Sequence, residues 1–168
     1  ERPVAFGLSE LQYLMHQLGP ASPEIVTILQ EDIDSWQIAF DDDVSMRIDW
    51  HEEHARVVMS CAIGRADADA REPVYAALLE ANLQLTGVAS VKLALGPDDD
   101  VMLIGEFDPD DATIDALRDK VVEFLEFAAK FSSLVTGADA PAADDAAPTD
   151  PLPPDPAPTD PARNIHRA

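Results

Sequence analysis

The 168-residue chain has few basic side chains, one cysteine and no long apolar run, and each shortage excludes a class of protein. Eleven lysines and arginines stand against 33 aspartates and glutamates, which gives a formal net charge of −22. Nucleic acids and anionic membrane surfaces are bound through lysine and arginine, so neither is an expected partner. No apolar run approaches the ~20 residues of a membrane-spanning helix, which predicts a soluble protein without membrane insertion.

The chain also lacks the sequence signatures of catalysis. It contains neither a glycine-rich phosphate loop nor a GxSxG elbow. Its one cysteine, Cys61, allows no internal disulfide and favours a reducing compartment. Because Cys61 falls in an apolar segment without a paired histidine in an activating context, a buried thiol is favoured over a nucleophile. We therefore expect a protein that is not an enzyme and has no catalytic residue.

Two segments offer metal-ligand chemistry, but local structure explains both better. His51 and His54 flank two glutamates, yet their spacing is not that of the HExxH zinc helix, and they fall in a predicted strand turn. The segment that begins at Asp108 lacks the glycine at position six of a calcium loop and the glutamate at position twelve, where Asp119 stands. We expect a solvated turn and a helix cap, and no metal site.

Proline and aspartate are concentrated in residues 137–168, which hold eight prolines, six aspartates, nine alanines and no aromatic residue. Residues 147–161 read APTDP, LPPDP, APTDP, a five-residue repeat. Such a segment favours extended polyproline conformations and has too little apolar area to offset its ordering entropy. We predict a folded domain over residues 1–136 and a disordered acidic tail over residues 137–168. A solubilising role for the tail is favoured over a role as a PxxP ligand.

The acidity belongs mainly to the predicted folded body. Without the six aspartates and two arginines of residues 137–168, the body keeps 27 acidic and 9 basic side chains, a net charge of −18. Such a surface keeps a protein soluble and attracts basic segments over long range. The alternative, an acidic surface that is only solvated, stays open for any single residue.

Hydrophobic periodicity divides the body into helices and strands. Apolar residues three and four apart predict helices over residues 7–18, 23–31, 71–86 and 109–131, the last with Asp108 as its N-cap. Alternation predicts strands over residues 36–40, 44–50, 57–63, 88–95 and 101–107, joined by polar turns such as residues 41–43 and 98–100. Apart from the short helix over residues 23–31, the order is α-β-β-β-α-β-β-α. This order predicts an α+β fold, in which helices pack on one twisted antiparallel sheet.

The middle helix, over residues 71–86, is apolar around most of its circumference. From Val74 to Leu85 only Glu80, Asn82 and Gln84 are clearly polar. A helix that covers one sheet needs a single apolar stripe. This helix therefore has more apolar surface than packing on the sheet requires.

The central block PVYAALLEANLQLTGVASVKLALGPDDDVMLIGEF, residues 73–107, together with the element order, small size and low pI, resembles the class I type III secretion chaperones. This family is also called the Tir chaperone or CesT-type family. Within the block, the LLEAN sequence of residues 78–82 stands on the middle helix, and Gly87 leads into the paired strands. The resemblance covers roughly residues 6–132. The segment from Ser22 to Asp34 departs from the short link that usually follows the first helix in this family.

The resemblance implies a homodimer in the bacterial cytoplasm that uses no cofactor. Such a chaperone binds a secreted effector protein near the effector's N-terminus, keeps that segment soluble and extended, and hands it to the secretion apparatus. Components of the apparatus, such as its ATPase, are implied partners as well. Dimers of this family commonly meet through the middle helix, which agrees with its apolar circumference. The implied dimer interface is Tyr75, Leu78, Leu79, Asn82, Leu83 and Leu85.

An effector-binding surface in this family involves the first helix and the outer sheet, where an extended peptide adds to a sheet edge. The implied candidates are Leu11, Leu14, Ile38, Phe40, Val44, Met46 and Ile48. The alternative, that most of these are core residues under the helices, stays open. So does a different use of the same fold, as a regulatory or scaffold module without secretion cargo. A metal-dependent or small-molecule enzyme is a third hypothesis and would need a polar cleft.

Overall fold

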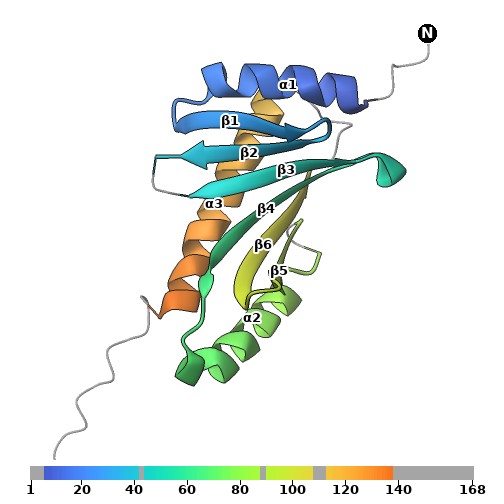
Figure 1. Cartoon of the computed structure of the whole chain (residues 1–168). Coiled ribbons are helices and arrows are strands. Elements are labelled where there is room, and N and C mark those ends of the chain that lie inside the picture. The colour runs from blue at the N-terminus through green and yellow to red at the C-terminus, as the bar shows by residue number, and fades with distance from the viewer. Residues whose placement is uncertain (1–5, 42–43, 88–89, 108–112, 138–168) are drawn as a thin grey trace, which may run out of the picture.

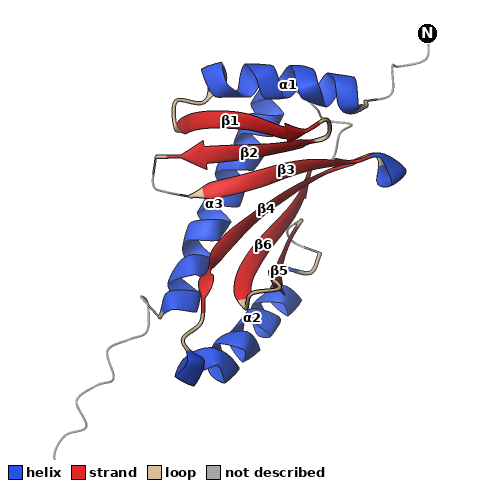
Figure 2. Cartoon of the chain, in the orientation of Figure 1, coloured by secondary structure: helices blue, strands red, loops and turns tan. Residues whose placement is uncertain are grey.

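A computed structural model describes residues 6–41, 44–87, 90–107 and 113–137 of the chain (Figures 1 and 2). The elements are α1 (Leu8–Ala21), β1 (Ile25–Asp32), β2 (Ser35–Phe40), β3 (Ser45–His51), β4 (Arg56–Arg65), α2 (Arg71–Leu85), β5 (Val91–Leu95), β6 (Asp100–Phe107) and α3 (Ile114–Thr136). The α+β fold predicted from periodicity is confirmed, with one strand more than the sequence indicated.

The strands form one six-stranded antiparallel sheet in the order β1-β2-β3-β4-β6-β5. The first four strands follow one another as a meander, and β6 then inserts between β4 and β5. The sheet is twisted, so that β1 and β5 run in clearly different directions in Figure 1. β1 and β5 are therefore the two edge strands.

The helix predicted over residues 23–31 is wrong, because these residues form most of β1. Four residues in a row from Ile25 to Ile28 are β-branched, and such side chains pack well on a pleated sheet. The helix-like spacing of Ile25 and Ile28 has a structural cause, since the register of β1 against β2 shifts between Ile25 and Thr27. A bulge of this kind changes which side chains share a face, so an alternating pattern is no longer visible in the sequence.

The last helix begins later than predicted. α3 starts at Ile114, and the Thr113 hydroxyl accepts a hydrogen bond of 3.1 Å from the Ala116 N–H, which is N-cap geometry. The predicted cap Asp108 and the proline after it lie outside the described residues. So do residues 42 and 43 of the predicted 41–43 turn, the first residues of the predicted 88–95 strand and the proline-rich tail beyond Gly137.

The hydrophobic core lies between the sheet and the helices α1 and α3. α3 runs behind the sheet in Figure 1, and α1 lies across the end that β1 forms. α1 contributes Leu11 and Leu18, and α3 contributes Phe124, all of them fully buried. Gly105 on β6 makes room for Phe124, because a Cβ atom at Gly105 would stand 2.9 Å from the phenylalanine ring.

α2 packs against the β5 edge of the sheet rather than over a face. The Asn82 side chain accepts a hydrogen bond of 2.8 Å from the Leu93 N–H and donates one of 2.9 Å to the Leu93 carbonyl. These bonds satisfy backbone groups on the outer edge of β5, which would otherwise offer a pairing site. Leu78 lies on the same side of α2 and is buried in the core.

Candidate functional site

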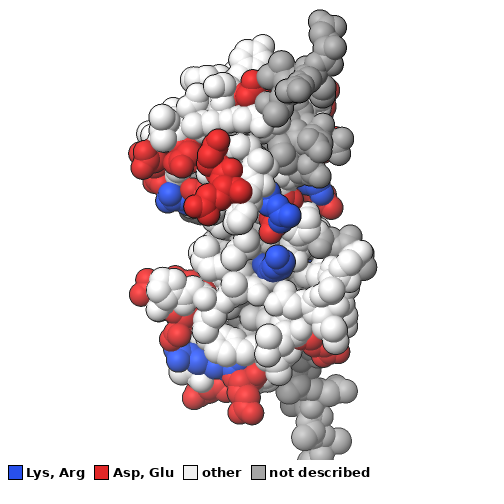
Figure 3. All heavy atoms as spheres, turned by 90° about the vertical axis from the view of Figure 1, so that its right-hand side faces the viewer, with Lys and Arg blue, Asp and Glu red and all other residues white. Residues whose placement is uncertain are grey.

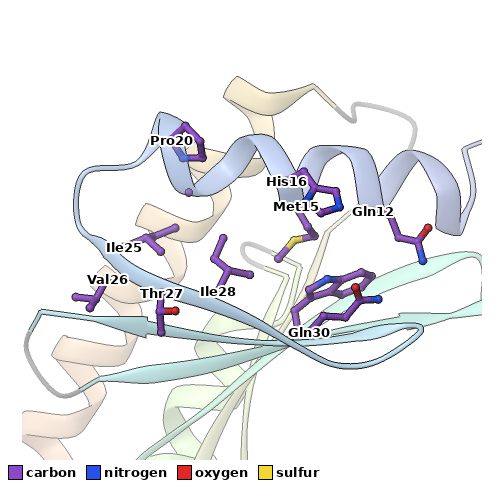
Figure 4. A pocket seen from close by; sticks show the side chains of 11 residues that line it. Gln12, Met15, His16, Pro20, Ile25, Val26, Thr27, Ile28 and Gln30 are labelled. Carbon is purple, nitrogen blue, oxygen red and sulfur yellow. The ribbon is translucent and has the colours of Figure 1, made fainter.

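A groove with a volume of about 610 Å³ separates α1 from β1 (Figure 4). We call it the α1 groove. Its apolar lining comes from Met15 and Pro20 on α1, from Ile25 and Ile28 on β1, and from Trp36 on β2. Its polar lining consists of Gln12, His16, Thr27 and Gln30. The arrangement suits a segment with apolar side chains and a polar backbone, and its described lining contains no lysine or arginine to hold a phosphate.

β1 borders this groove and carries exposed apolar side chains. Val26 is 62% exposed and Leu29 is 61% exposed, and both lie on the edge strand itself. Ile33 after β1 and Tyr13 on α1 are exposed as well. Large apolar side chains gathered on one part of a surface are typical of a protein-binding site.

Polar contacts hold β1 in place at its C-terminal end. The Arg47 guanidinium on β3 lies 3.0 Å from a Glu31 carboxylate oxygen of β1 and 2.8 Å from a carboxylate oxygen of Asp49. These acidic neighbours raise the pKa of Arg47, chiefly through the hydrogen bond to Asp49. The Gln12 amide of α1 also donates a hydrogen bond of 3.1 Å to the Ile33 carbonyl. The edge strand is thus fixed to the fold through its side chains and its pairing with β2.

A second groove of about 590 Å³ lies between the C-terminal half of α3 and the neighbouring ends of the sheet strands. We call it the α3 groove. Its apolar lining is formed by Phe40, Val44, Ile63, Leu125 and Ala128. Glu24 and Asp41 line it together with the hydroxyl-bearing residues of the last α3 turns, Ser132, Ser133 and Thr136.

The structure divides the seven predicted effector-binding residues into two groups. Leu11, Leu14, Ile38, Met46 and Ile48 are buried core residues. Phe40, which is also a buried core residue, lines the α3 groove together with the half-buried Val44. The first group therefore lies in the core under the helices, as the alternative in the sequence analysis predicts. Contact of any of the seven with an effector stays a prediction.

The exposed apolar residues near the α1 groove were not singled out from the sequence. Val26 and Leu29 stood in the segment predicted as a helix, so their place on a sheet edge was not foreseen. The signal that was available is the run of β-branched residues in β1, which favours a strand over a helix.

The α2 residues predicted at a dimer interface also fall into two groups. Leu79 and Leu83 point outward and are 71% and 76% exposed. Leu78 is buried, Tyr75 and Leu85 are half-buried against the core, and Asn82 holds the β5 edge. The outward pair follows the helical repeat and forms an apolar stripe, which is the part of α2 available to a second molecule.

The two histidines considered as metal ligands lie at the surface, and the cysteine is buried. His51 and His54 line a shallow surface hollow with Arg56 and Glu106, and Glu106 lies 2.6 Å from the Arg56 guanidinium. Within the described residues no group of three metal-ligating side chains comes together. Cys61 is buried in β4, and this burial raises the pKa of its thiol to about 11, so that the thiolate nucleophile is disfavoured.

Acidic side chains form several clusters on the face drawn in Figure 3, and basic side chains form only small groups between them. Wide areas between the charges carry uncharged side chains. A surface with this balance attracts positively charged segments and offers apolar area for contact. No helix in the described part of the chain is long and apolar enough to cross a membrane.

Comparison with known protein families gives one matching model, described as the Tir chaperone protein (CesT) family, over residues 31–132. The match covers the strands from β2 onward, α2 and most of α3. A comparison with curated protein sequences finds no match.

Solved structures share the fold at low sequence identity. A chain of the ExsC-ExsE complex has a TM-score of 0.65 at 13% identity, and the match covers 78% of this chain and 97% of that one. A chain of the HopA1-SchA chaperone-effector complex has a TM-score of 0.60 at 11% identity, with 78% and 99% covered. The Yersinia pestis type III secretion chaperone SycH in complex with a fragment of YscM2 gives 0.53 at 16% identity, with 73% and 97% covered.

Proposed function

The chain belongs to the Tir chaperone protein (CesT) family, and from this membership we propose that it is a type III secretion chaperone. It binds the N-terminal chaperone-binding segment of a cognate effector and keeps that segment soluble and partly non-globular. It then delivers the effector to the secretion apparatus, where the ATPase is a further partner. The site of action is the bacterial cytoplasm. The chaperone acts by binding alone, without a cofactor or a catalytic residue.

The observation that carries this proposal is the α1 groove beside the edge strand β1. An extended segment that pairs with an edge strand gains main-chain hydrogen bonds, and the neighbouring groove receives its apolar side chains. Val26 and Leu29 supply exposed apolar area along the same edge. Small molecules are usually held in enclosed pockets, whereas a strand edge beside an open groove suits an extended chain.

The proposed chaperone is a homodimer that meets through the exposed stripe of α2. Leu79 and Leu83 are large apolar side chains that a monomer would leave in water. Burial of a leucine side chain contributes about 1.5–3 kcal/mol relative to full exposure, and a twofold interface would bury each of them twice. Asn82 and Leu78 support this interface from within, because they fix α2 to β5 and to the core.

Two substitutions on β1 test the binding surface. The variant Val26→Asp/Leu29→Asp places charges on the exposed side chains of the edge strand, where the fold has no need of the apolar groups. We expect it to fold normally and to lose co-purification with the N-terminal ~100 residues of secreted proteins encoded beside it. Val122→Asp, on the exposed side of α3, is the matched control and should retain binding. Retained binding by the β1 variant would refute the proposed surface.

A further inference from the structure

The α3 groove has an apolar floor and a negative charge. Its described lining contains Glu24 and Asp41 and no lysine or arginine. It reaches Thr136, the last residue of α3, where the carbonyl end of the helix adds negative potential. No basic residue in the last turn of α3 offsets that potential. The groove therefore favours an apolar side chain that is flanked by positive charges.

One segment outside the described residues has this character. Residues 163–168 read RNIHRA, with Ile165 between Arg163 and Arg167 and without an acidic residue. These two arginines are the only ones in residues 137–168, and the six aspartates of that stretch all precede them. The basic group is thus concentrated in one short segment around a β-branched apolar side chain.

We propose that residues 163–168 bind the α3 groove of the same chain. Ile165 contacts the apolar floor formed by Phe40, Val44 and Leu125, and the two arginines face the carboxylates of Glu24 and Asp41. The α1 groove suits this segment less well, because no acidic residue lines it among the residues that the structure describes. A partner segment that enters the α3 groove must displace residues 163–168, so the tail is a built-in competitor for that groove.

The connection between groove and segment favours binding within one chain. The tail leaves the fold directly after Thr136, which lines the groove, so the attachment point and the binding site are adjacent. The 25 residues from 138 to 162 span up to about 78 Å at ~3.1 Å per residue, far more than the return path requires. A tether of this kind gives an effective concentration on the order of millimolar. A segment with an intrinsic Kd of about 0.1 mM would then be bound about 90% of the time.

Methyl NMR of the full chain tests this proposal. Ile165→Ser removes the apolar anchor from the tail, and Leu152→Ser removes the other large aliphatic side chain of residues 138–168 as the matched control. We expect Ile165→Ser, and likewise Arg163→Glu/Arg167→Glu, to shift the methyl resonances of Val44, Ile63 and Leu125. Leu152→Ser should leave those resonances unchanged. Identical groove resonances in the full chain and the Ile165→Ser variant would overturn the proposal.

Two further measurements distinguish binding within the chain from binding between copies. The shifts should be independent of protein concentration, and raised salt should move them toward those of the Ile165→Ser variant, because screening weakens the ion pairs. Labelled Ile165→Ser chains mixed with unlabelled wild-type chains should keep the variant resonances. Restoration of the wild-type resonances in that mixture, or shifts that depend on concentration, would assign the occupant to a second copy and contradict the proposal.

Discussion

At the residue scale, burial changes the chemistry of Cys61. Its thiol lies in β4 among core side chains, and burial raises its pKa from the ordinary value of 9.0 to about 11. The neutral thiol is thus favoured in the folded state, and the unfolded chain loses the proton first as the pH rises. The contribution of this residue to stability is therefore complete below about pH 9 and is lost as the pH rises towards 11.

We predict that the free energy of unfolding of the wild type falls by about 2 kcal/mol more than that of Cys61→Ala between about pH 8 and about pH 10.5. Urea unfolding of both proteins at the two pH values measures this difference, because the other titrating groups are common to both. An equal pH dependence in the two proteins would show that Cys61 keeps an ordinary pKa.

Asn82 illustrates what residue identity alone could not reveal. The resemblance placed it at the dimer interface, whereas the structure uses both polar atoms of its amide on Leu93 of the same chain. The sequence showed a polar residue on an apolar helix, but no pattern indicated which backbone its side chain meets. That partner depends on how α2 lies against β5, which is a property of the tertiary structure.

Replacement of Asn82 by alanine should destabilise the fold by about 1–3 kcal/mol, because it leaves the N–H and carbonyl of Leu93 without these partners. Gln84→Ala, at an exposed position of the same helix, is the control and should change stability by less than about 0.5 kcal/mol. Chemical denaturation compares the two. If Asn82→Ala and Gln84→Ala were equally stable, the hydrogen bonds of Asn82 to β5 would make no net contribution to the free energy of unfolding.

The helix α2 carries apolar side chains on two opposite sides, and the described fold buries one of these sides. One side buries Leu78 and holds β5, and the opposite side exposes Leu79 and Leu83. The sequence predicted the surplus of apolar surface, since nearly all positions from Val74 to Leu85 are apolar or small. It did not show which leucines face inward, because a helix with apolar residues on all sides has no polar side that would mark its outward face.

This division gives a prediction for the oligomeric state. Leu79→Asp/Leu83→Asp should yield a monomer with the folded circular dichroism spectrum, since charges at these exposed positions oppose association without entering the core. Its thermal midpoint should fall only by the stability that the dimer interface contributes. Leu78→Asp should instead unfold the chain, because it buries an unpaired charge. Sedimentation velocity with circular dichroism checks both, and Tyr13→Asp on α1 is the control for a distant exposed apolar residue. A folded dimer of the Leu79/Leu83 variant would exclude this interface.

The strand β1 shows where sequence-based prediction of an element failed. Strands with an uninterrupted alternation, such as β3 and β6, were predicted to within a residue or two. β1 has two register shifts against β2, so its buried side chains do not alternate along the sequence. Val26 and Leu29 of the proposed binding surface lie on this strand, so the sequence analysis does not place them at a sheet edge, whereas it does predict the fold.

At the scale of the whole molecule, charge and shape act together. The net charge of −22 disfavours partners that bind through phosphate, and both grooves and the β1 edge offer apolar area. A protein of this kind attracts a positively charged segment from a distance and then holds it by apolar and main-chain contacts. Family membership supports an effector-binding chaperone, and the open edge with its groove is the basis for the proposed extended cargo.

The most direct test of this account is hydrogen–deuterium exchange on a secreted protein co-expressed with the full chain. We predict that one contiguous segment near the N-terminus of the secreted protein becomes protected in the complex, and that β1 of the chaperone becomes protected with it. The remainder of the secreted protein should exchange as it does alone. Protection confined to a folded C-terminal domain, or a complex that leaves β1 unprotected, would contradict the central claim.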